Sequence, residues 1–120
     1  MKASDLFVRC LEAEGVERIF GVPGEENADV MISLDASSID FILCRHEQAA
    51  AYMAFGYAQA GGEVGTALVV PGPGLLNASA GVGTAYAASS PVLLISGQVD
   101  SDAIGDNRDA LHQVHDQLEF

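Results

Sequence analysis

Apolar residues gather in short runs separated by turn-forming residues, and the spacing of these runs predicts strands that alternate with helices. Strands are expected at residues 18–22, 39–43, 66–70 and 92–96. Helices are expected at residues 5–14, 25–34, 47–60 and 75–88. Alternation at this spacing favours crossover connections. We therefore expect an α/β protein, a three-layer parallel sheet with helices on both faces.

The helical spacing also predicts which faces are buried. In the first helix, Ser4 is expected to be the N-cap and Gly15 to end the helix in the left-handed conformation. The inner face of this helix is expected to carry Leu6, Phe7, Cys10 and Leu11. The inner face of the second helix is expected to carry Val30, Met31 and Leu34. The third strand is uniformly apolar, as expected of a strand buried on both faces.

The segments that follow the strands are candidates for a site, because ligands of parallel sheets bind outside the carboxyl ends of the strands. These segments are residues 22–24, 45–47, 71–74 and 97–98. Three of them are turns with glycine, where the backbone can approach a ligand closely. Residues 45–47 are the only charged triplet at a strand end.

Glu47 opens a helix whose other residues are mostly Ala, Met, Phe and Tyr. A zinc-protease motif is excluded, because Ala50 stands four positions after His46. In one interpretation Glu47 complements the helix dipole. In the other it is a desolvated acid with a raised pKa that shares a proton with a ligand nitrogen.

The turn at residues 71–74 is either a rigid strand-to-helix connection or a wall for a flat ring, with Asn77 as a polar contact. Gly72 and Gly74 do not make a dinucleotide fingerprint, because the third glycine is missing. A phosphate-binding P-loop is excluded, since no Gly-Lys-Ser/Thr is present. An unrelated nucleotide-binding domain is therefore disfavoured.

Two further features leave alternatives open. Gly81 and Gly83 lie in the middle of a predicted helix, where glycine costs stability, so a backbone of the same fold or of another subunit is expected to pack there. His112 and His115 are three residues apart and followed by Asp116, but no distant Cys/His pair completes a metal site. That segment is either a solvated tail or a polar surface facing the substrate.

Composition narrows the classes of partner. The 120 residues fit one domain, residues 1–120. The 17 acidic and 5 basic residues give a net charge of -12, which argues against nucleic acid and anionic membranes. The hydrophobic share of 49% is high for a short chain and indicates that a partner covers part of the surface. Cys10 and Cys44 lie in apolar stretches and are expected to be buried free thiols. With no evident signal peptide, a cytoplasmic protein is expected.

Four motifs occur in one order with matching intervals, at residues 20–27, 45–50, 72–77 and 91–98. Together with residues 56–60, they resemble the N-terminal, pyrimidine-binding domain of thiamine diphosphate-dependent enzymes. The resemblance covers nearly the whole chain and is greatest to the acetolactate synthase, benzoylformate decarboxylase and benzaldehyde lyase group. It implies the thiamine diphosphate-binding fold, incomplete at the C-terminus.

The resemblance also implies roles for individual residues. Glu47 would hydrogen-bond N1′ of the cofactor's aminopyrimidine and, by sharing that proton, promote loss of the proton on thiazolium C2. The cofactor would act as electron sink for a 2-oxo acid or an aldehyde. Walls on the two sides of the pyrimidine would come from Pro23 and Gly24, and from Gly72, Pro73, Gly74 and Asn77. His112 and Gln113 would face the substrate.

The chain also departs from the family pattern. Family members bind the diphosphate and Mg²⁺ through a second domain with a Gly-Asp-Gly motif, which this chain lacks. The chain is thus expected to be half of a decarboxylase or carboligase, a lyase or transferase, and to carry no metal ligand. Its expected partner is a diphosphate-binding domain or subunit in a homo- or hetero-oligomer such as a dimer. Alone it is expected to bind cofactor poorly and to be inactive.

Two questions stay open from the sequence. The chain is a truncated piece, the product of a split gene, or a subunit that needs a partner. The alternative function is a non-catalytic docking or regulatory remnant that pairs with full-length relatives.

Overall fold

A computed structural model describes residues 1–61, 63–106 and 108–119 of the chain. Gly62, expected with Gly61 to end the third helix, and residues 107 and 120 lie outside the described residues. Each predicted strand and helix is present, with bounds that differ by up to three residues, and the start of the second helix is a 3-10 helix. The elements are α1 (Ala3–Ala13), β1 (Arg18–Gly21), η1 (Glu25–Asn27), α2 (Ala28–Asp35), β2 (Asp40–Leu43), α3 (Glu47–Gly61), β3 (Gly65–Val69), α4 (Pro73–Ala87) and β4 (Val92–Ser96).

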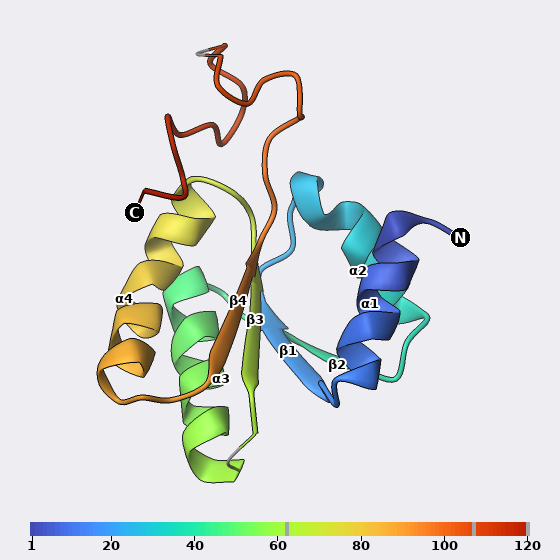
Figure 1. Cartoon of the computed structure of the whole chain (residues 1–120), viewed down its shortest axis with the longest axis vertical. Coiled ribbons are helices and arrows are strands. Elements are labelled where there is room, and N and C mark those ends of the chain that lie inside the picture. The colour runs from blue at the N-terminus through green and yellow to red at the C-terminus, as the bar shows by residue number, and fades with distance from the viewer. Residues whose placement is uncertain (62, 107, 120) are drawn as a thin grey trace.

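The four strands form one sheet in the order β2-β1-β3-β4, and every neighbouring pair is parallel. In the register, Ile19 of β1 pairs with Phe41 of β2 on one side and with Thr66 of β3 on the other. Helices α1 and α2 lie on one side of this sheet, and α3 and α4 lie on the other (Figure 1). The predicted α/β class with a three-layer parallel sheet is therefore confirmed.

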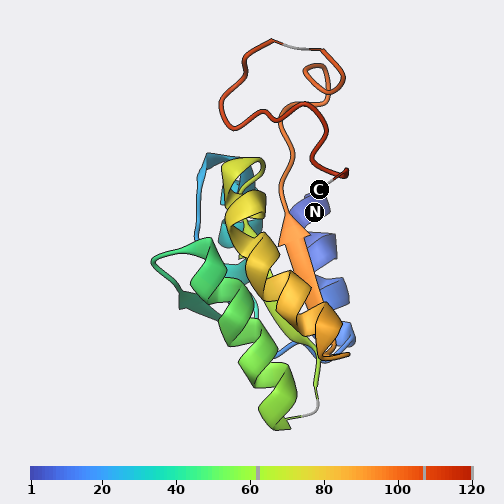
Figure 2. The ribbon, with the colours of Figure 1, turned by 90° about the vertical axis from the view of Figure 1, so that its left-hand side faces the viewer.

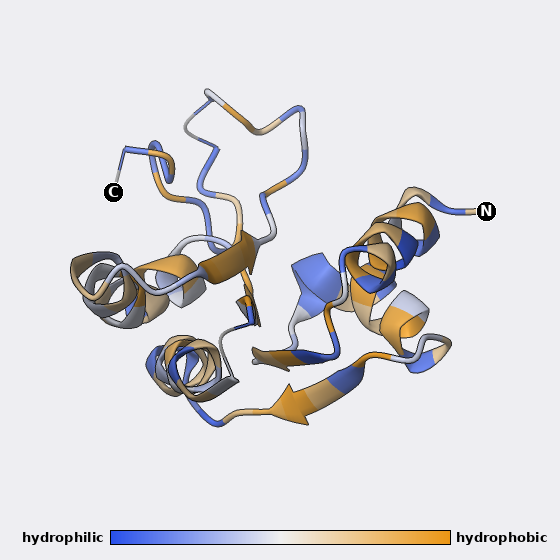
Figure 3. Cartoon of the chain, turned by 60° about the horizontal axis from the view of Figure 1, so that its bottom comes forward, coloured by the Kyte–Doolittle hydropathy of each residue, from blue (hydrophilic) through white to orange (hydrophobic). Residues whose placement is uncertain are grey.

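The core has two sides because successive strand residues point to opposite faces of the sheet. Ile19 packs with Val8 of α1 and Leu34 of α2, whereas the next residue, Phe20, packs with Ala50 of α3. Strand β3 is buried along its whole length, as its apolar sequence predicts. In Figure 3 the strand arrows between the two helix layers are largely in the apolar colour.

Helix α1 differs from the prediction in its start and in its inner face. It begins at Ala3 with Lys2 in the N-cap position, so the prediction that Ser4 caps the helix is wrong; the Ser4 hydroxyl accepts a hydrogen bond from Ser33 instead. The buried residues are Val8 and Leu11. The predicted inner-face residues Leu6, Phe7 and Cys10 are exposed. An unbroken apolar run at residues 6–8 fits several faces of a helix, and only the docking of α1 selects one.

The remaining local expectations are largely confirmed. Gly15 has a positive φ of 82°, as expected at the end of α1. In α2, Leu34 is buried, and Val30 and Met31 pack against the same core. The segment before α2 is a 3-10 helix rather than an α-helix, because the Gly24 N–H donates to the side chain of Asn27 and tightens that turn.

The two cysteines lie in different environments. Cys44 is buried as expected, and this burial raises the pKa of its thiol. Cys10 is exposed, so the prediction of two buried thiols is wrong for Cys10, which lies on the outward face of α1.

Residues 97–119 follow β4 without forming a helix or strand in the part of the segment that the structure describes. This segment arches over the end of the sheet where the strands terminate (Figure 2). Within the described ranges, none of the helices is both long and apolar enough to cross a membrane.

Candidate functional site

The parallel register brings the predicted site segments to one edge of the sheet. The last residue of β1, Gly21, pairs with Leu43 of β2 and with Leu68 of β3, and Val69 pairs with Ser96 of β4. Each of these strand ends leads into one of the four candidate segments. The candidate site is therefore the carboxyl edge, at the top of the sheet in Figure 1.

Glu47 and Asn77 meet at this edge although they are thirty residues apart in the sequence. Glu47 opens α3 and is half-buried, and its Oε2 accepts a hydrogen bond from Asn77 Nδ2 of α4 at 3.0 Å. Among the residues that the structure describes, Asn77 is the only donor to this carboxylate. The second oxygen, Oε1, is therefore available to a donor from outside the chain.

The turn between β3 and α4 passes close to Glu47. Gly72 precedes the first residue of α4 and has a positive φ of 59°, a conformation that favours glycine. Pro73 follows at the first helical position, where its missing N–H is not needed. A Cβ on Gly74 would lie 3.7 Å from Glu47 Cγ and only 2.6 Å from Val70 Cγ2. Gly74 therefore allows the turn to close on Val70 beside the carboxylate.

The turn between β1 and α2 lies against the same valine. A Cβ on Gly24 would collide with the Val70 side chain, so glycine is needed here for close packing. The Gly24 N–H donates to Asn27 Oδ1 at 2.9 Å, and Pro23 is exposed beside it. The two turns predicted to face a pyrimidine ring are therefore neighbours, joined through Val70.

His112 lies at the carboxyl edge, and its backbone has the left-handed φ of 63°. Its Nδ1 lies within hydrogen-bonding distance of the Glu26 carboxylate in η1. The side chain of Gln113 is directed into its own loop, where it donates to the carbonyl oxygens of Ala103 and Asp106. The structure thus brings His112, but not the amide of Gln113, to the predicted edge.

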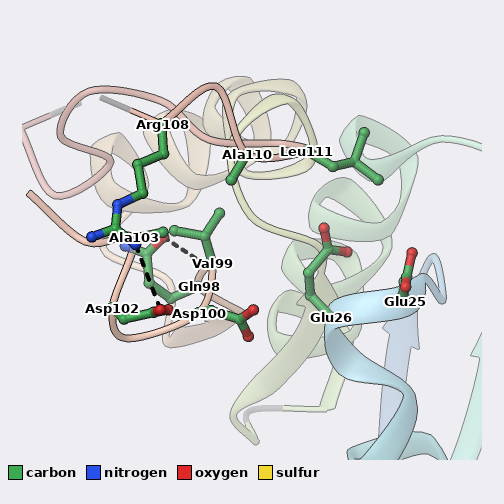
Figure 4. Close-up of a pocket in the computed structure, with 10 residues that line it drawn as sticks. All are labelled: Glu25, Glu26, Gln98, Val99, Asp100, Asp102, Ala103, Arg108, Ala110 and Leu111. Atoms are coloured by element: carbon green, nitrogen blue, oxygen red, sulfur yellow. Dashed lines mark hydrogen bonds and ion pairs between the residues drawn. The ribbon is translucent and has the colours of Figure 1, made fainter. Parts of the chain in front are cut away.

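A cavity of about 530 Å³ lies between η1 and the loop after β4 (Figure 4). Glu25 and Glu26 lie on one side, and Asp100 and Asp102 lie on the other. Arg108 also lines the cavity and pairs with Asp102 at 3.6 Å. Carboxylates therefore dominate this cavity, and its field favours cationic or N–H-bearing groups.

Some residues of the edge were missed by sequence reasoning. Asn27 is 2% exposed and Gln117 is 8% exposed, and both use their side-chain amides to bond backbone at this edge. Asn27 follows Gly24 by three residues, a spacing typical of a turn, which could have found it. Gln117 lies in a segment without periodicity, and no local signal points to it.

The metal ligands that the sequence could offer are His112, His115 and Asp116. Within residues 1–61, 63–106 and 108–119, no group of three or more His, Cys, Asp or Glu side chains is arranged to hold a metal ion. His115 is exposed and Asp116 accepts from the backbone N–H of Leu118.

Comparison with known proteins places this chain in a family. The family model described as thiamine pyrophosphate enzyme, N-terminal TPP binding domain, matches residues 1–120. The chain is 45% identical over 114 residues to the probable acetolactate synthase large subunit of Methanocaldococcus jannaschii, covering 95% of this chain and 19% of that protein. It is 45% identical over 106 residues to the acetolactate synthase isozyme 3 large subunit of Escherichia coli K12, covering 88% and 18%.

A relative named for a different activity matches over a similar length. The probable 2-ketoarginine decarboxylase AruI of Pseudomonas aeruginosa is 39% identical over 117 residues, covering 98% of this chain and 21% of that protein. The chain therefore spans about a fifth of the length of the relatives it matches.

Proposed function

Because this chain belongs to the thiamine pyrophosphate enzymes, as their N-terminal TPP-binding domain, we propose that it supplies the pyrimidine half of a thiamine diphosphate site. Thiamine pyrophosphate and thiamine diphosphate are the same compound. The observation that carries the proposal is the Glu47–Asn77 pair, which leaves one carboxylate oxygen available beside the glycine-containing turn at residues 71–74.

The residues of the edge fit a ring that carries N–H donors. Glu47 Oε1 has no donor among the described residues, and Glu26 Oε2 is buried without a hydrogen-bond partner there. An aminopyrimidine brings the donors that such oxygens lack. Pro23 and Gly24 on one turn, and Gly72, Pro73 and Gly74 on the other, would hold it between them.

Within this site Glu47 would hold and share a proton with a ring nitrogen at Oε1. Asn77 fixes the other oxygen, so the carboxylate is oriented before a ligand arrives. When bound, thiamine diphosphate supplies an electron-withdrawing thiazolium that stabilises negative charge on a substrate carbon. His112 would lie toward the substrate, at the margin of the acidic cavity.

The reaction that best suits the family is decarboxylation or carboligation of a 2-oxo acid. The relatives include both a probable acetolactate synthase and a probable decarboxylase. The diphosphate and its Mg²⁺ would be held by a second domain or subunit, since the chain contains no Gly-Asp-Gly. The isolated chain would then be inactive.

A partner is also supported by the surface of α3 and α4. Helix α4 contains no charged residue and α3 contains only Glu47. Large apolar side chains on this surface are exposed at Tyr52, Met53, Leu76 and Tyr86. In a chain with a net charge of -12, an uncharged apolar surface is the part best suited to contact a domain or a second subunit.

Replacement of Glu47 tests the proposal. With the complementary diphosphate-binding domain present, Glu47→Gln is expected to lower turnover of a 2-oxo acid by about 10²–10⁴-fold, because proton sharing with the ring is lost. The matched control is Glu14→Gln, at an exposed carboxylate just after α1, which should retain turnover.

Titration calorimetry with thiamine diphosphate and Mg²⁺ is the second readout. The chain alone should bind weakly, and binding should tighten when the complementary domain is added. Full turnover by Glu47→Gln would show that Glu47 does not share the proton with the ring. A different result would favour the alternative function, a non-catalytic docking or regulatory remnant. In that case the unsubstituted chain would bind a full-length relative, and the complex would show no turnover that depends on this chain.

A further inference from the structure

Gln117 is a buried polar side chain in a segment without regular structure. It is 8% exposed, and both ends of its amide are used. Its Oε1 accepts the N–H of Gly72 at 3.2 Å, and its Nε2 donates to the carbonyl oxygen of Gly97 at 2.9 Å. These two backbone groups follow β3 and β4, which are neighbours in the sheet.

The position of this amide continues the hydrogen bonding of the sheet. The last paired residues of the two strands are Val69 and Ser96, and the Gly97 N–H still donates to Val69 at 3.3 Å. Beyond that bond the two strands diverge. The chain after β3 enters the turn before α4, and the chain after β4 enters the C-terminal segment. Gln117 bridges them there, so it satisfies a buried N–H and a carbonyl that the strands themselves no longer pair.

The same segment covers Gly72 from a second direction. A Cβ on Gly72 would collide with the carbonyl oxygen of His112 and would lie 3.4 Å from Val114 Cγ1. The side chain of His112 meanwhile reaches Glu26 in η1. Residues 112–117 therefore contact both turns that form the proposed pyrimidine site.

A comparison with Asn27 shows what is distinctive here. Asn27 accepts the N–H of Gly24 from three residues away, so that turn is stabilised locally. Gln117 does the same for Gly72 from forty-five residues away. The Gly24 N–H therefore finds its acceptor locally, whereas the Gly72 N–H finds its acceptor in the C-terminal segment.

We propose that Gln117 is a positioning residue that fixes the Gly72 turn and, through the first turn of α4, the Asn77–Glu47 pair. The effect on Glu47 rests on the proposed function; the effect on Gly72 does not. Without the Gln117 acceptor the buried Gly72 N–H loses its partner, and the turn rearranges to find another. The start of α4, which carries Asn77, then loses its defined distance from Glu47.

Hydrogen exchange and NMR of the 120-residue chain test this without cofactor or partner. In Gln117→Met, which keeps the length but removes both polar groups, exchange of the Gly72 amide should accelerate about tenfold. In Gln117→Glu a carboxylate oxygen still accepts from Gly72, so its protection should be largely retained. The Gly97 carbonyl carbon resonance should shift in both variants, because neither donates to it. Gln59→Met, on an exposed glutamine of α3, is the matched control and should change neither signal.

The enzymatic readout is taken with the complementary domain present. Gln117→Met should lower kcat, and Gln117→Glu should recover most of it at a similar unfolding midpoint, which a general loss of stability would not produce. Unchanged Gly72 exchange in Gln117→Met would overturn the proposal, whatever the Glu47 variants show. If Gln117→Met fails to fold, accelerated Gly72 exchange in Gln117→Glu would overturn it equally. Altered Gly72 exchange together with full activity of Glu47→Gln would instead overturn the proposed function alone.

Discussion

Cys44 and Cys10 differ in the access that solvent has to their sulfur atoms. Cys44 packs under α3 with Phe20 and Ala50, and burial raises the pKa of its thiol, so little thiolate forms. Cys10 lies on the outer face of α1. We expect Cys10 to react with a maleimide in the native chain and Cys44 to react only after denaturant is added.

Mass spectrometry of the labelled chain checks this expectation. Cys10→Ser should abolish native labelling, and Cys44→Ser should leave it unchanged. Rapid native labelling at Cys44 would show that α3 does not cover it.

Glu12 carries a hydrogen-bonded carboxylate that ties α1 to the turn before β2. Bonds from the Ser38 backbone N–H at 2.8 Å and from its hydroxyl at 2.7 Å hold the pKa of Glu12 below its usual range. A lowered folded-state pKa stabilises the fold above the usual range, and this contribution is lost as pH falls through the lowered pKa. Wild type should therefore be more stable than Glu12→Gln near neutral pH, and the two should converge in acid.

Urea unfolding across that pH interval measures the difference. The matched control is Glu14→Gln, at an exposed carboxylate just after α1 that accepts neither of the Ser38 bonds. A gap between wild type and Glu12→Gln that stays constant into acid would contradict the assignment.

At the scale of the elements, Gly81 and Gly83 of α4 differ in the space around them. A Cβ on Gly81 would lie 2.5 Å from the Ala51 Cβ, whereas a Cβ on Gly83 would meet nothing within 4 Å. Gly81→Ala should thus push α4 away from α3 and destabilise the chain by about 1–3 kcal/mol. Gly83→Ala should stabilise it by up to about 1 kcal/mol, because alanine favours the helix.

Chemical denaturation of Gly81→Ala and Gly83→Ala measures both expected changes in stability. The sequence left open whether these glycines serve the fold or a second subunit, and Gly81 serves the fold through α3. If Gly83→Ala weakens association with the complementary domain while stabilising the isolated chain, Gly83 serves a contact between subunits. A destabilised Gly83→Ala would contradict the open space around it.

The elements were predictable because short apolar runs and Gly or Pro turns mark them along the chain. The inward face of α1 was not, since three adjacent apolar residues fit more than one face and the docking against Leu34 and Ile19 decides. The position of Glu47 followed from the rule for carboxyl ends of parallel strands, and that of Asn77 followed from its place just after the 71–74 turn. Gln117 could not be found in this way, because its contact joins residues forty-five apart and its segment has no period.

At the scale of the whole molecule, the charged residues are unevenly distributed. Most of the acidic residues lie outside α3 and α4, whose outer surface is uncharged apart from Glu47. Part of the apolar excess noted in the sequence lies on this surface, where Tyr52 and Tyr86 are exposed. An interaction with a complementary domain across this surface would bury apolar area without bringing like charges together.

The sheet order also has a consequence for the aggregation of the isolated chain. Within the described residues β4 pairs only with β3, so its other side presents a row of backbone donors and acceptors with Leu93 exposed beside it. Such a row is a template for strands of other copies. Near neutral pH, mutual repulsion of chains with a charge of -12 opposes that growth. Acidification below about pH 4 discharges the carboxylates, so edge-to-edge pairing of β4 between free chains would then meet less repulsion.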